Sequence, residues 1–385
     1  MKHFAILTEI NDCNYGALLQ GFALATVIRQ LGAQADQIDF WYRPHNKSLW
    51  GTLAKKKTLV GQFWQFLSMA LKFHSLAFAR VRTLRSLRSK SFLESFVPLT
   101  PQSYRTTAAL ATLPTTYDGV IVGSDQVWNP DHMAAPNPFL LANLPEALPR
   151  FAYAASLGVP EVPEARRQEY RSALAKFKAI SLREASNVPE IQSYTTCPVS
   201  AVLDPTLLLD GDTWRKLLHL HLPSEAAGET CIYWLGSPEV LLDIARKAAP
   251  CHIYTEPSFL SRRLNGKPIK PLLEAIDGVS YHPDAGPLQF LRALDQAKQI
   301  ISDSYHAMLF CANLGRPCNI VLEATGPRAR MRLRMYDFLS AYAQETSVLT
   351  SPGAPLQPQH IHLSVAFHEA KNRSRDWLKT FLQLD

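Results

Sequence analysis

The chain begins with the apolar run His3-Phe4-Ala5-Ile6-Leu7-Thr8 and passes through the polar residues 9–14 into Tyr15-Gly16-Ala17-Leu18-Leu19-Gln20-Gly21-Phe22-Ala23-Leu24. Apolar side chains continue at helical spacing as far as Leu31, and Gly32 supplies a stop signal. A strand followed by a polar loop and a crossover helix is the unit from which parallel sheets are built. This opening therefore predicts an α/β fold.

The same pattern continues in two series, separated by a polar, turn-forming stretch at residues 223–229. The first series predicts strands at residues 3–8, 37–40, 119–122, 151–155, 179–182 and 199–203. The second predicts strands at residues 231–235, 252–255, 300–301 and 319–322, and helices at residues 288–298 and 307–314. We therefore expect two α/β domains, residues 1–223 and residues 229–385, with a C-terminal helix over residues 364–384.

The composition is that of an ordinary globular protein. Its 385 residues are 47% hydrophobic and 19% charged, which is far from the composition of disordered chains. The six cysteines form no Cys-x-x-Cys pair, which argues against a zinc ribbon or a disulfide scaffold and favours the cytoplasm. The first apolar run reaches Glu9 too soon for a signal peptide, and no apolar segment approaches the roughly 20 residues that span a bilayer.

Residues 55–90 are the most basic part of the chain and lie within a helical excursion expected over residues 55–105. They contain no Asp or Glu, and the apolar residues from Val60 to Phe78 follow helical spacing. A basic helix with an aromatic stripe is typical of helices that lie on a membrane surface. The alternative is a solvated excursion whose stripe packs on its own domain. Nucleic acid is not an expected partner, because no recognised nucleic-acid-binding motif accompanies the charge.

Two polar clusters lie next to predicted strands, where ligands bind in open α/β sheets. Residues 11–16 come directly before the first helix, whose free backbone N–H groups could hold an anion or a sugar hydroxyl. The alternative is that Asn14 only caps this helix. In residues 123–130, Asp125 could accept sugar hydroxyls while the indole of Trp128 covers the apolar side of the ring. Asp125 could equally satisfy backbone N–H groups of its own turn.

Two further clusters, residues 181–184 and 303–306, also follow short predicted strands. The guanidinium fork of Arg183 suits a carboxylate or a phosphate, because it gives two parallel charge-assisted bonds. His306 could donate to a phosphate or exchange a proton near neutral pH. The alternatives are an ion pair between Arg183 and Glu184 and a structural role for His306. No grouping of His and carboxylate has metal-ligand spacing, so no metal site is expected.

Six blocks, in this order, resemble the polysaccharide pyruvyl transferase family. They are NYGALLQGFAL at 14–24, GSDQVW at 123–128, AYAASLG at 152–158, ISLRE at 180–184, LDPTLLL at 203–209 and SDSYH at 302–306. The resemblance implies two Rossmann-like domains facing a cleft, similar to B-type glycosyltransferases, with the acceptor on the first domain and the donor on the second. It also implies pyruvate ketal formation on a sugar, with phosphoenolpyruvate as co-substrate and no further cofactor.

By the same resemblance, Arg183 and His306 are expected to hold the phosphate and carboxylate of phosphoenolpyruvate. Some members of the family carry an Arg where this chain has Ser304, which we also place in the donor site. Arg328 or Arg330, in the basic run after Gly326, is then expected to supply the missing charge.

The chemistry also needs a base and an acid, for which Asp125 and His306 are the candidates. The residues expected to contact the acceptor are Asn14, Tyr15, Asp125 and Trp128. The acceptor would be a sugar of a cell-surface polysaccharide or its lipid-linked precursor, met at the inner face of the cell membrane if residues 55–90 contact lipid. Two rival functions remain: a nucleotide-sugar glycosyltransferase of the same fold, and a non-catalytic sugar-binding protein.

Overall fold

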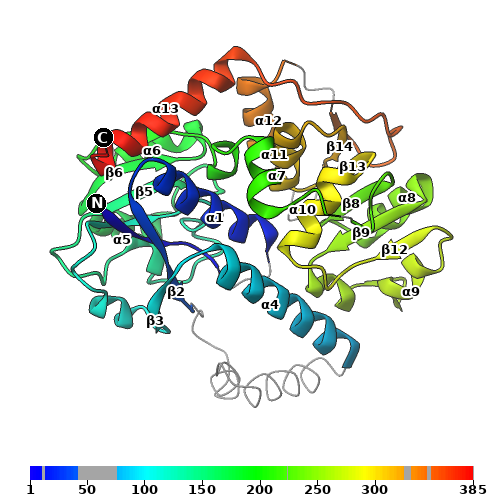
Figure 1. The fold of residues 1–385 in the computed structure, drawn as a ribbon, viewed down its shortest axis with the longest axis horizontal. Helices are drawn as coiled ribbons and strands as arrows, with labels where there is room; N and C mark the ends of the chain where they lie inside the picture. Colours follow the sequence, from blue (N-terminus) through cyan, green and yellow to red (C-terminus); the bar gives the residue numbers. More distant parts are fainter. Residues whose placement is uncertain (11–13, 42–75, 223, 325–330, 345–347, 385) are drawn as a thin grey trace.

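The computed structural model describes residues 1–10, 14–41, 76–222, 224–324, 331–344 and 348–384 (Figure 1). Its first sheet has seven strands, and all their pairings are parallel. Their order across the sheet is β3 (Leu99–Tyr104), β2 (Gln34–Phe40), β1 (His3–Leu7), β4 (Gly119–Val122), β5 (Arg150–Ala155), β6 (Phe177–Leu182) and β7 (Val199–Ala201).

The second sheet has six strands, again paired in parallel. Their order is β12 (Val279–Tyr281), β9 (Cys251–Thr255), β8 (Thr230–Trp234), β13 (Gln299–Ser302), β14 (Cys318–Val321) and β15 (Leu349–Thr350). A small hairpin, β10 (Arg263–Leu264) and β11 (Lys267–Pro268), lies outside both sheets. The expectation of two parallel-sheet α/β domains is confirmed.

Both sheets share one strand order. Numbered along the chain within each sheet, the strands run 3-2-1-4-5-6, and the first sheet adds a seventh. This is the doubly wound order, in which the connections change direction between strands 1 and 4 and leave a crevice at the carboxyl ends of the strands. The switch points lie between β1 and β4 in the first domain and between β8 and β13 in the second. A ligand site is expected where these strands end.

Helix α1 (Tyr15–Gln30) lies in the core where the two domains meet. It has apolar side chains on most of its circumference, and all but a few of its residues are buried. The ring of Tyr15 stacks on Phe290 of α10 (Pro287–Gln296), with ring centroids 4.2 Å apart. One apolar cluster thus runs from α1 through α10 to α11 (Tyr305–Leu314). The remaining α-helices not yet introduced, apart from α4 and α13, are α5 (Glu164–Leu174), α6 (Val188–Gln192), α7 (Gly211–Leu218), α8 (Pro238–Ala248), α9 (Ile269–Glu274) and α12 (Met331–Tyr342).

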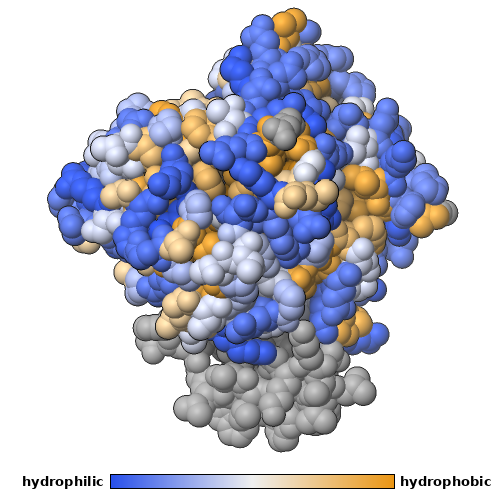
Figure 2. Space-filling model, turned by 60° about the vertical axis from the view of Figure 1, so that its left-hand side comes forward, coloured by the Kyte–Doolittle hydropathy of each residue, from blue (hydrophilic) through white to orange (hydrophobic). Residues whose placement is uncertain are grey.

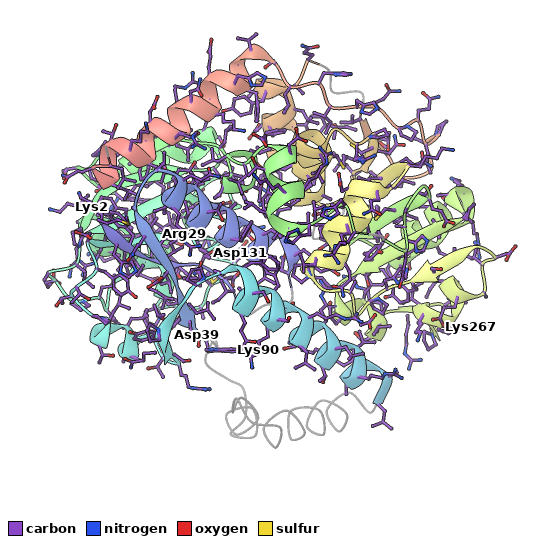
Figure 3. The ribbon with its side chains drawn as sticks, viewed as in Figure 1. Lys2, Arg29, Asp39, Lys90, Asp131 and Lys267 are labelled. Atoms are coloured by element: carbon purple, nitrogen blue, oxygen red, sulfur yellow. The ribbon has the colours of Figure 1, made fainter. Side chains whose placement is uncertain are left out.

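The C-terminal helix α13 (Val365–Leu382) crosses back to the first domain (Figure 1). Its Trp377 contacts Tyr153 of β5, with ring centroids 5.7 Å apart, and its Ser374 Oγ accepts from the backbone N–H of Leu203. At the other end of the chain, Lys2 donates from Nζ to the carbonyl of Leu382 at 3.1 Å (Figure 3). The helix predicted over residues 364–384, which we assigned to the second domain, therefore contacts both domains: it packs on α12 near its start and on the first domain further along.

Helix α4 (Leu76–Phe96) is the described part of the basic excursion, and it reaches from the first domain to the second (Figure 1). Arg85 is fully buried and donates to the carbonyl of Thr255, and Arg88 forms an ion pair with Asp284 at 2.9 Å. Two of the basic residues thus dock the second domain, which neither sequence-based alternative anticipated. Residues 55–75 lie outside the described residues, so membrane contact there stays a prediction.

On the face shown in Figure 2, hydrophobic residues are interspersed with hydrophilic ones. Among the described helices, none combines the length and the apolar character needed to cross a membrane.

Candidate active site

The carboxyl ends of β4, β6 and β13 bring three predicted site residues together. Arg183 Nη1 lies 3.7 Å from Asp125 Oδ1 and 3.2 Å from Asp204 Oδ2. Nε2 of His306, from the second domain, lies 3.5 Å from the same Asp204 oxygen. Asp204 therefore links the cation of the first domain to the imidazole of the second. These contacts form the candidate site.

Arg183 is the centre of a buried ion network. Its side chain is 1% exposed, and its Nε donates to Glu184 Oε1, which also accepts from Ser156 Oγ at 2.8 Å. Burial alone would lower the pKa of Arg183, but the charges of the adjacent carboxylates outweigh burial and raise it. Arg183 is thus charged, and its buried Nη2 has no hydrogen-bond partner among the described residues. Both the predicted ion pair with Glu184 and a spare donor are present.

Asp204 is held ionised by its partners. Its Oδ2 accepts from Ser124 Oγ at 2.9 Å, and its Oδ1 accepts from the backbone and hydroxyl of Thr206. Burial raises the pKa of this carboxyl, yet His306, Arg183 and Thr206 together hold it well below its usual range. The sequence contained a signal for this residue in the Asp-Pro-Thr block, but we assigned it no role.

Asp125 has an unusual backbone conformation at the end of β4. Its φ is 77°, in the left-handed region that residues other than Gly rarely adopt. The turn is held by the carbonyl of Asp125, which accepts from the backbone N–H of Ser156, and by its side chain, which accepts from the N–H of Gln126. Such strain persists where surrounding contacts enforce it, and it concentrates at functional sites. The local-turn alternative is therefore correct, and the same turn places the carboxylate opposite Arg183.

His306 packs directly against the start of α1. A Cβ at Gly16 would lie 2.6 Å from Cγ of His306 and would clash with Nδ1 as well, so only glycine fits without movement. The Asn-Tyr-Gly block and the His block thus meet across the domain boundary. Nε2 of His306 is buried, and its contact with Asp204 Oδ2 is long, at 3.5 Å. It lies beside Arg183 at the same carboxylate oxygen.

Arg334 of α12 is a site residue that the sequence analysis missed. Its guanidinium lies 5.2 Å from the ring centroid of Tyr305, and that of Arg183 lies 4.7 Å from the same centroid. Burial, and next the charge of Arg183, lower the pKa of Arg334 to about 10. Arg328 and Arg330 lie outside the described residues. Within the described part of the chain, Arg334 is the second buried cation of this site. No local signal distinguished it from its neighbours, because only the packing of α12 brings it to Tyr305.

Four predicted contact residues have other partners in the structure. Trp128 is fully buried, and its indole N–H donates to the carbonyl of Phe139, so its ring is a core element. The hydroxyl of Tyr15 donates to the carbonyl of Ala285 in the second domain. Asn14 caps α1 by accepting from the N–H of Gly16, and Ser304 caps α11. These placements do not support ligand contact by Trp128 or Tyr15, because burial and hydrogen bonding already occupy both rings.

The chain is similar to one protein family and to several solved structures. A family model described as polysaccharide pyruvyl transferase matches residues 14–322. No curated protein matches the chain. Among solved structures, UDP-GlcNAc 2-epimerase from Neisseria meningitidis bound to UDP-GlcNAc is 13% identical, with a TM-score of 0.44 over 100% of this chain and 94% of that one. Heptosyltransferase WaaC from E. coli with ADP is 14% identical, with a TM-score of 0.39 over 99% of both chains.

Proposed function

Because the chain belongs to the polysaccharide pyruvyl transferase family, we propose that it transfers the pyruvyl group of phosphoenolpyruvate to a sugar as a ketal. The acceptor in this proposal is a sugar of a cell-surface polysaccharide or of its lipid-linked precursor. The donor carries a carboxylate and a phosphate, so its site must offer several hydrogen-bond donors and positive charge.

The unpartnered donor of Arg183 is the observation that carries the proposal. Buried polar atoms are almost always hydrogen-bonded, so an orphan among them calls for an explanation. Among the described residues, Arg183 Nη2 is buried and has no hydrogen-bond partner. Arg183 Nη1 and His306 Nε2 approach the same Asp204 oxygen from the two domains, at 3.2 Å and 3.5 Å. An anionic ligand oxygen would satisfy Arg183 Nη2, and a protonated His306 would offer a second bond. This supports a donor site at the domain boundary.

The balance of charge indicates how the site would accept an anion. Arg183 is surrounded by the carboxylates of Asp125, Glu184 and Asp204, which largely offset its charge. Arg334 adds a second cation, 5.2 Å from the centroid of the Tyr305 ring. Protonation of His306 would add a third cation, so that the number of positive charges would equal the number of these carboxylates. We therefore place the donor phosphate beside Arg334 and His306 and the donor carboxylate at Arg183.

The reaction needs few groups beyond these. Protonation of the methylene carbon of phosphoenolpyruvate makes C2 electrophilic, and one sugar hydroxyl attacks C2 as it loses its proton to a base. Phosphate then leaves, and the second hydroxyl closes the ketal. In our proposal Asp125 accepts the hydroxyl proton, and His306 donates a proton to the departing phosphate. Preorganised charge around the donor is typically the largest contribution to such catalysis, and the buried network of Arg183 is rigid enough to supply it.

Phosphate release tests the proposal. The protein is incubated with phosphoenolpyruvate and a lipid-linked oligosaccharide fraction, and the product mass is measured. We expect acceptor-dependent phosphate release and a product that carries one pyruvate ketal, both lost in Arg183→Lys and kept in Arg82→Lys, since Arg82 is exposed on α4. Thermal stabilisation by nucleotide sugars but not by phosphoenolpyruvate, without phosphate release, would instead establish the glycosyltransferase alternative.

A further inference from the structure

The side chains of two histidines in the second domain, His252 and His282, face each other. His252 is in β9, and His282 directly follows β12, which pairs with β9 in parallel. His252 Nδ1 and His282 Nε2 are 2.9 Å apart, and the two ring planes differ by only 12°. Each outer nitrogen faces a carboxylate: His252 Nε2 lies 3.0 Å from Glu229 and His282 Nδ1 lies 3.2 Å from Glu225.

The three contacts of this row offer more donor positions than two neutral rings can fill. A neutral imidazole carries one N–H, so two of them can donate in only two of the three contacts. If both outer nitrogens point their N–H groups at the carboxylates, the inner nitrogens present lone pairs to each other at 2.9 Å. In that tautomer the two lone pairs converge on one point between the rings. A cation at this point would be held by both histidines.

Several features favour a metal ion over a proton. The two inner nitrogens face each other at 2.9 Å, and the carboxylate of Glu225 lies close enough to act as a third ligand. Neutral imidazole is the form that binds Zn²⁺, Ni²⁺ and Co²⁺. Metal-binding histidines also commonly donate their other ring N–H to a carboxylate, which fixes the ring orientation. Glu229 is in that position for His252.

We propose that His252, His282 and Glu225 bind a divalent transition-metal ion such as Zn²⁺. One ligand atom from each of the three lies within 4.8 Å of the others. At Zn–N distances of about 2.0–2.1 Å the two nitrogens would be roughly 3.3 Å apart, so they need to separate by only a few tenths of an ångström. Glu225 is 74% exposed, which leaves its carboxylate free to swing from His282 to the metal and leaves room for water as a fourth ligand.

The position of the cluster indicates a structural role. Glu225 and Glu229 belong to the turn that joins the two domains, and this turn is anchored by Gln296, which accepts from the N–H of Ser224. His282 lies two residues before Asp284, the partner of Arg88 in α4. A metal ion would fasten the joining turn to the sheet edge that receives α4. We therefore expect it to raise thermal stability without taking part in the transfer reaction.

Metal titration of the full chain tests this site. The protein is treated with chelator, dialysed, and titrated with Zn²⁺ by calorimetry and with Co²⁺ by visible absorption. We expect one ion per chain, a tetrahedral Co²⁺ spectrum and an increase in the melting temperature. Absence of saturable binding, or a Co²⁺ spectrum of free hexaaqua ion at one equivalent, would overturn the proposal and leave a shared proton between the two rings.

Variants distinguish metal binding at this site from nonspecific metal binding at the protein surface. His252→Gln and His282→Gln should abolish the Co²⁺ spectrum, and the exposed variant Glu225→Gln should weaken binding without endangering the fold. Glu229→Gln should weaken it by about 10–100-fold through the lost orientation of His252. His360 and His362 are exposed, with ring centroids 6.1 Å apart, and serve as the matched control pair. Loss of the site in His360→Gln/His362→Gln, with retention in His282→Gln, would contradict the assignment.

Discussion

Two buried arginines at the domain boundary, Arg85 and Arg183, differ in what surrounds them. Both guanidinium groups lie over a tyrosine ring, Arg85 at 4.0 Å from the centroid of Tyr15 and Arg183 at 4.7 Å from that of Tyr305. Arg85 donates to main-chain carbonyls of the second domain. Arg183 is bound by carboxylates and retains an unpartnered donor.

This difference indicates that Arg85 holds α4 in place, whereas Arg183 is available to a ligand. Carbonyl acceptors are fixed parts of the backbone, so the bonds of Arg85 hold α4 against the second domain. The carboxylates around Arg183 are themselves buried charges. Removing them from water is unfavourable, so packing alone would not favour this arrangement. A spare donor in such a network suits a ligand that comes and goes. We therefore expect substitutions of Arg183 to change activity and substitutions of Arg85 to change stability.

The largest expected effect belongs to Arg183→Lys. The charge remains, but an ammonium group cannot reproduce the fork that meets Glu184, Asp204 and a ligand at once. We expect kcat/KM for phosphoenolpyruvate to fall by about 10²–10³-fold, the effect of one oxyanion-type donor, with a smaller loss of melting temperature than in Arg183→Met. An unchanged kcat/KM in the folded variant would place Arg183 with Arg85 among the fastening residues.

A smaller loss is expected for Gly16→Ala, which tests the contact between the Asn-Tyr-Gly block and the block that contains His306 without removing a charged group. The new methyl group would overlap the ring of His306 and push it away from Asp204. Misplacement of a reacting group by about 1 Å can cost about 10²-fold in rate, so kcat should fall by up to that amount. Gly32→Ala is a poor control because of its positive φ, so Ala17→Gly serves instead. Full activity in Gly16→Ala would remove His306 from the reaction.

Arg85→Gln should act on stability. Its loss would leave the carbonyls of Thr255 and Pro283 without their donor, which costs about 1–3 kcal/mol in the free energy of unfolding. Arg82→Gln is the matched control on the same helix, because Arg82 is exposed and surface substitutions usually stay within about 0.5 kcal/mol. Urea denaturation measures both. Equal stability of the two variants would mean that α4 docks through its apolar side chains alone.

The smallest effect concerns acid stability. The folded state holds the pKa of Asp204 below its ordinary value, so this carboxylate contributes stability that is complete above about pH 4 and is lost as the pH falls through the folded-state pKa. The difference in unfolding free energy between the wild type and Asp204→Asn should therefore narrow by at most about 1.4 kcal/mol per pH unit in acid. Urea denaturation between about pH 5 and pH 3 measures it. A constant difference would show that Asp204 is not the titrating group.

Local patterns were sufficient for the strands and for the stretches of chain that form the site. The apolar runs at residues 119–122 and 300–301 became β4 and part of β13, because a short buried strand has few other ways to satisfy its backbone. Polar residues that follow such strands lie at the carboxyl end of their own sheet, so Asp125 and Arg183 came together on the first sheet. His306 joins them from the second sheet through its packing against Gly16. The edge strands β3, β12 and β15 were missed, and in β3 Pro101 and polar neighbours hide the periodicity.

The sequence by itself determined the α/β class, most strand positions and the polar residues at the strand ends, because these depend on periodicity and on the order of elements along the chain. Only the tertiary structure decided that Trp128 lies in the core, that Arg334 lies beside Tyr305 and that His252 meets His282 across 30 residues. Each of these depends on which faces of distant elements pack together. Burial and electrostatic pairing are settled by those contacts, and a linear pattern does not contain them.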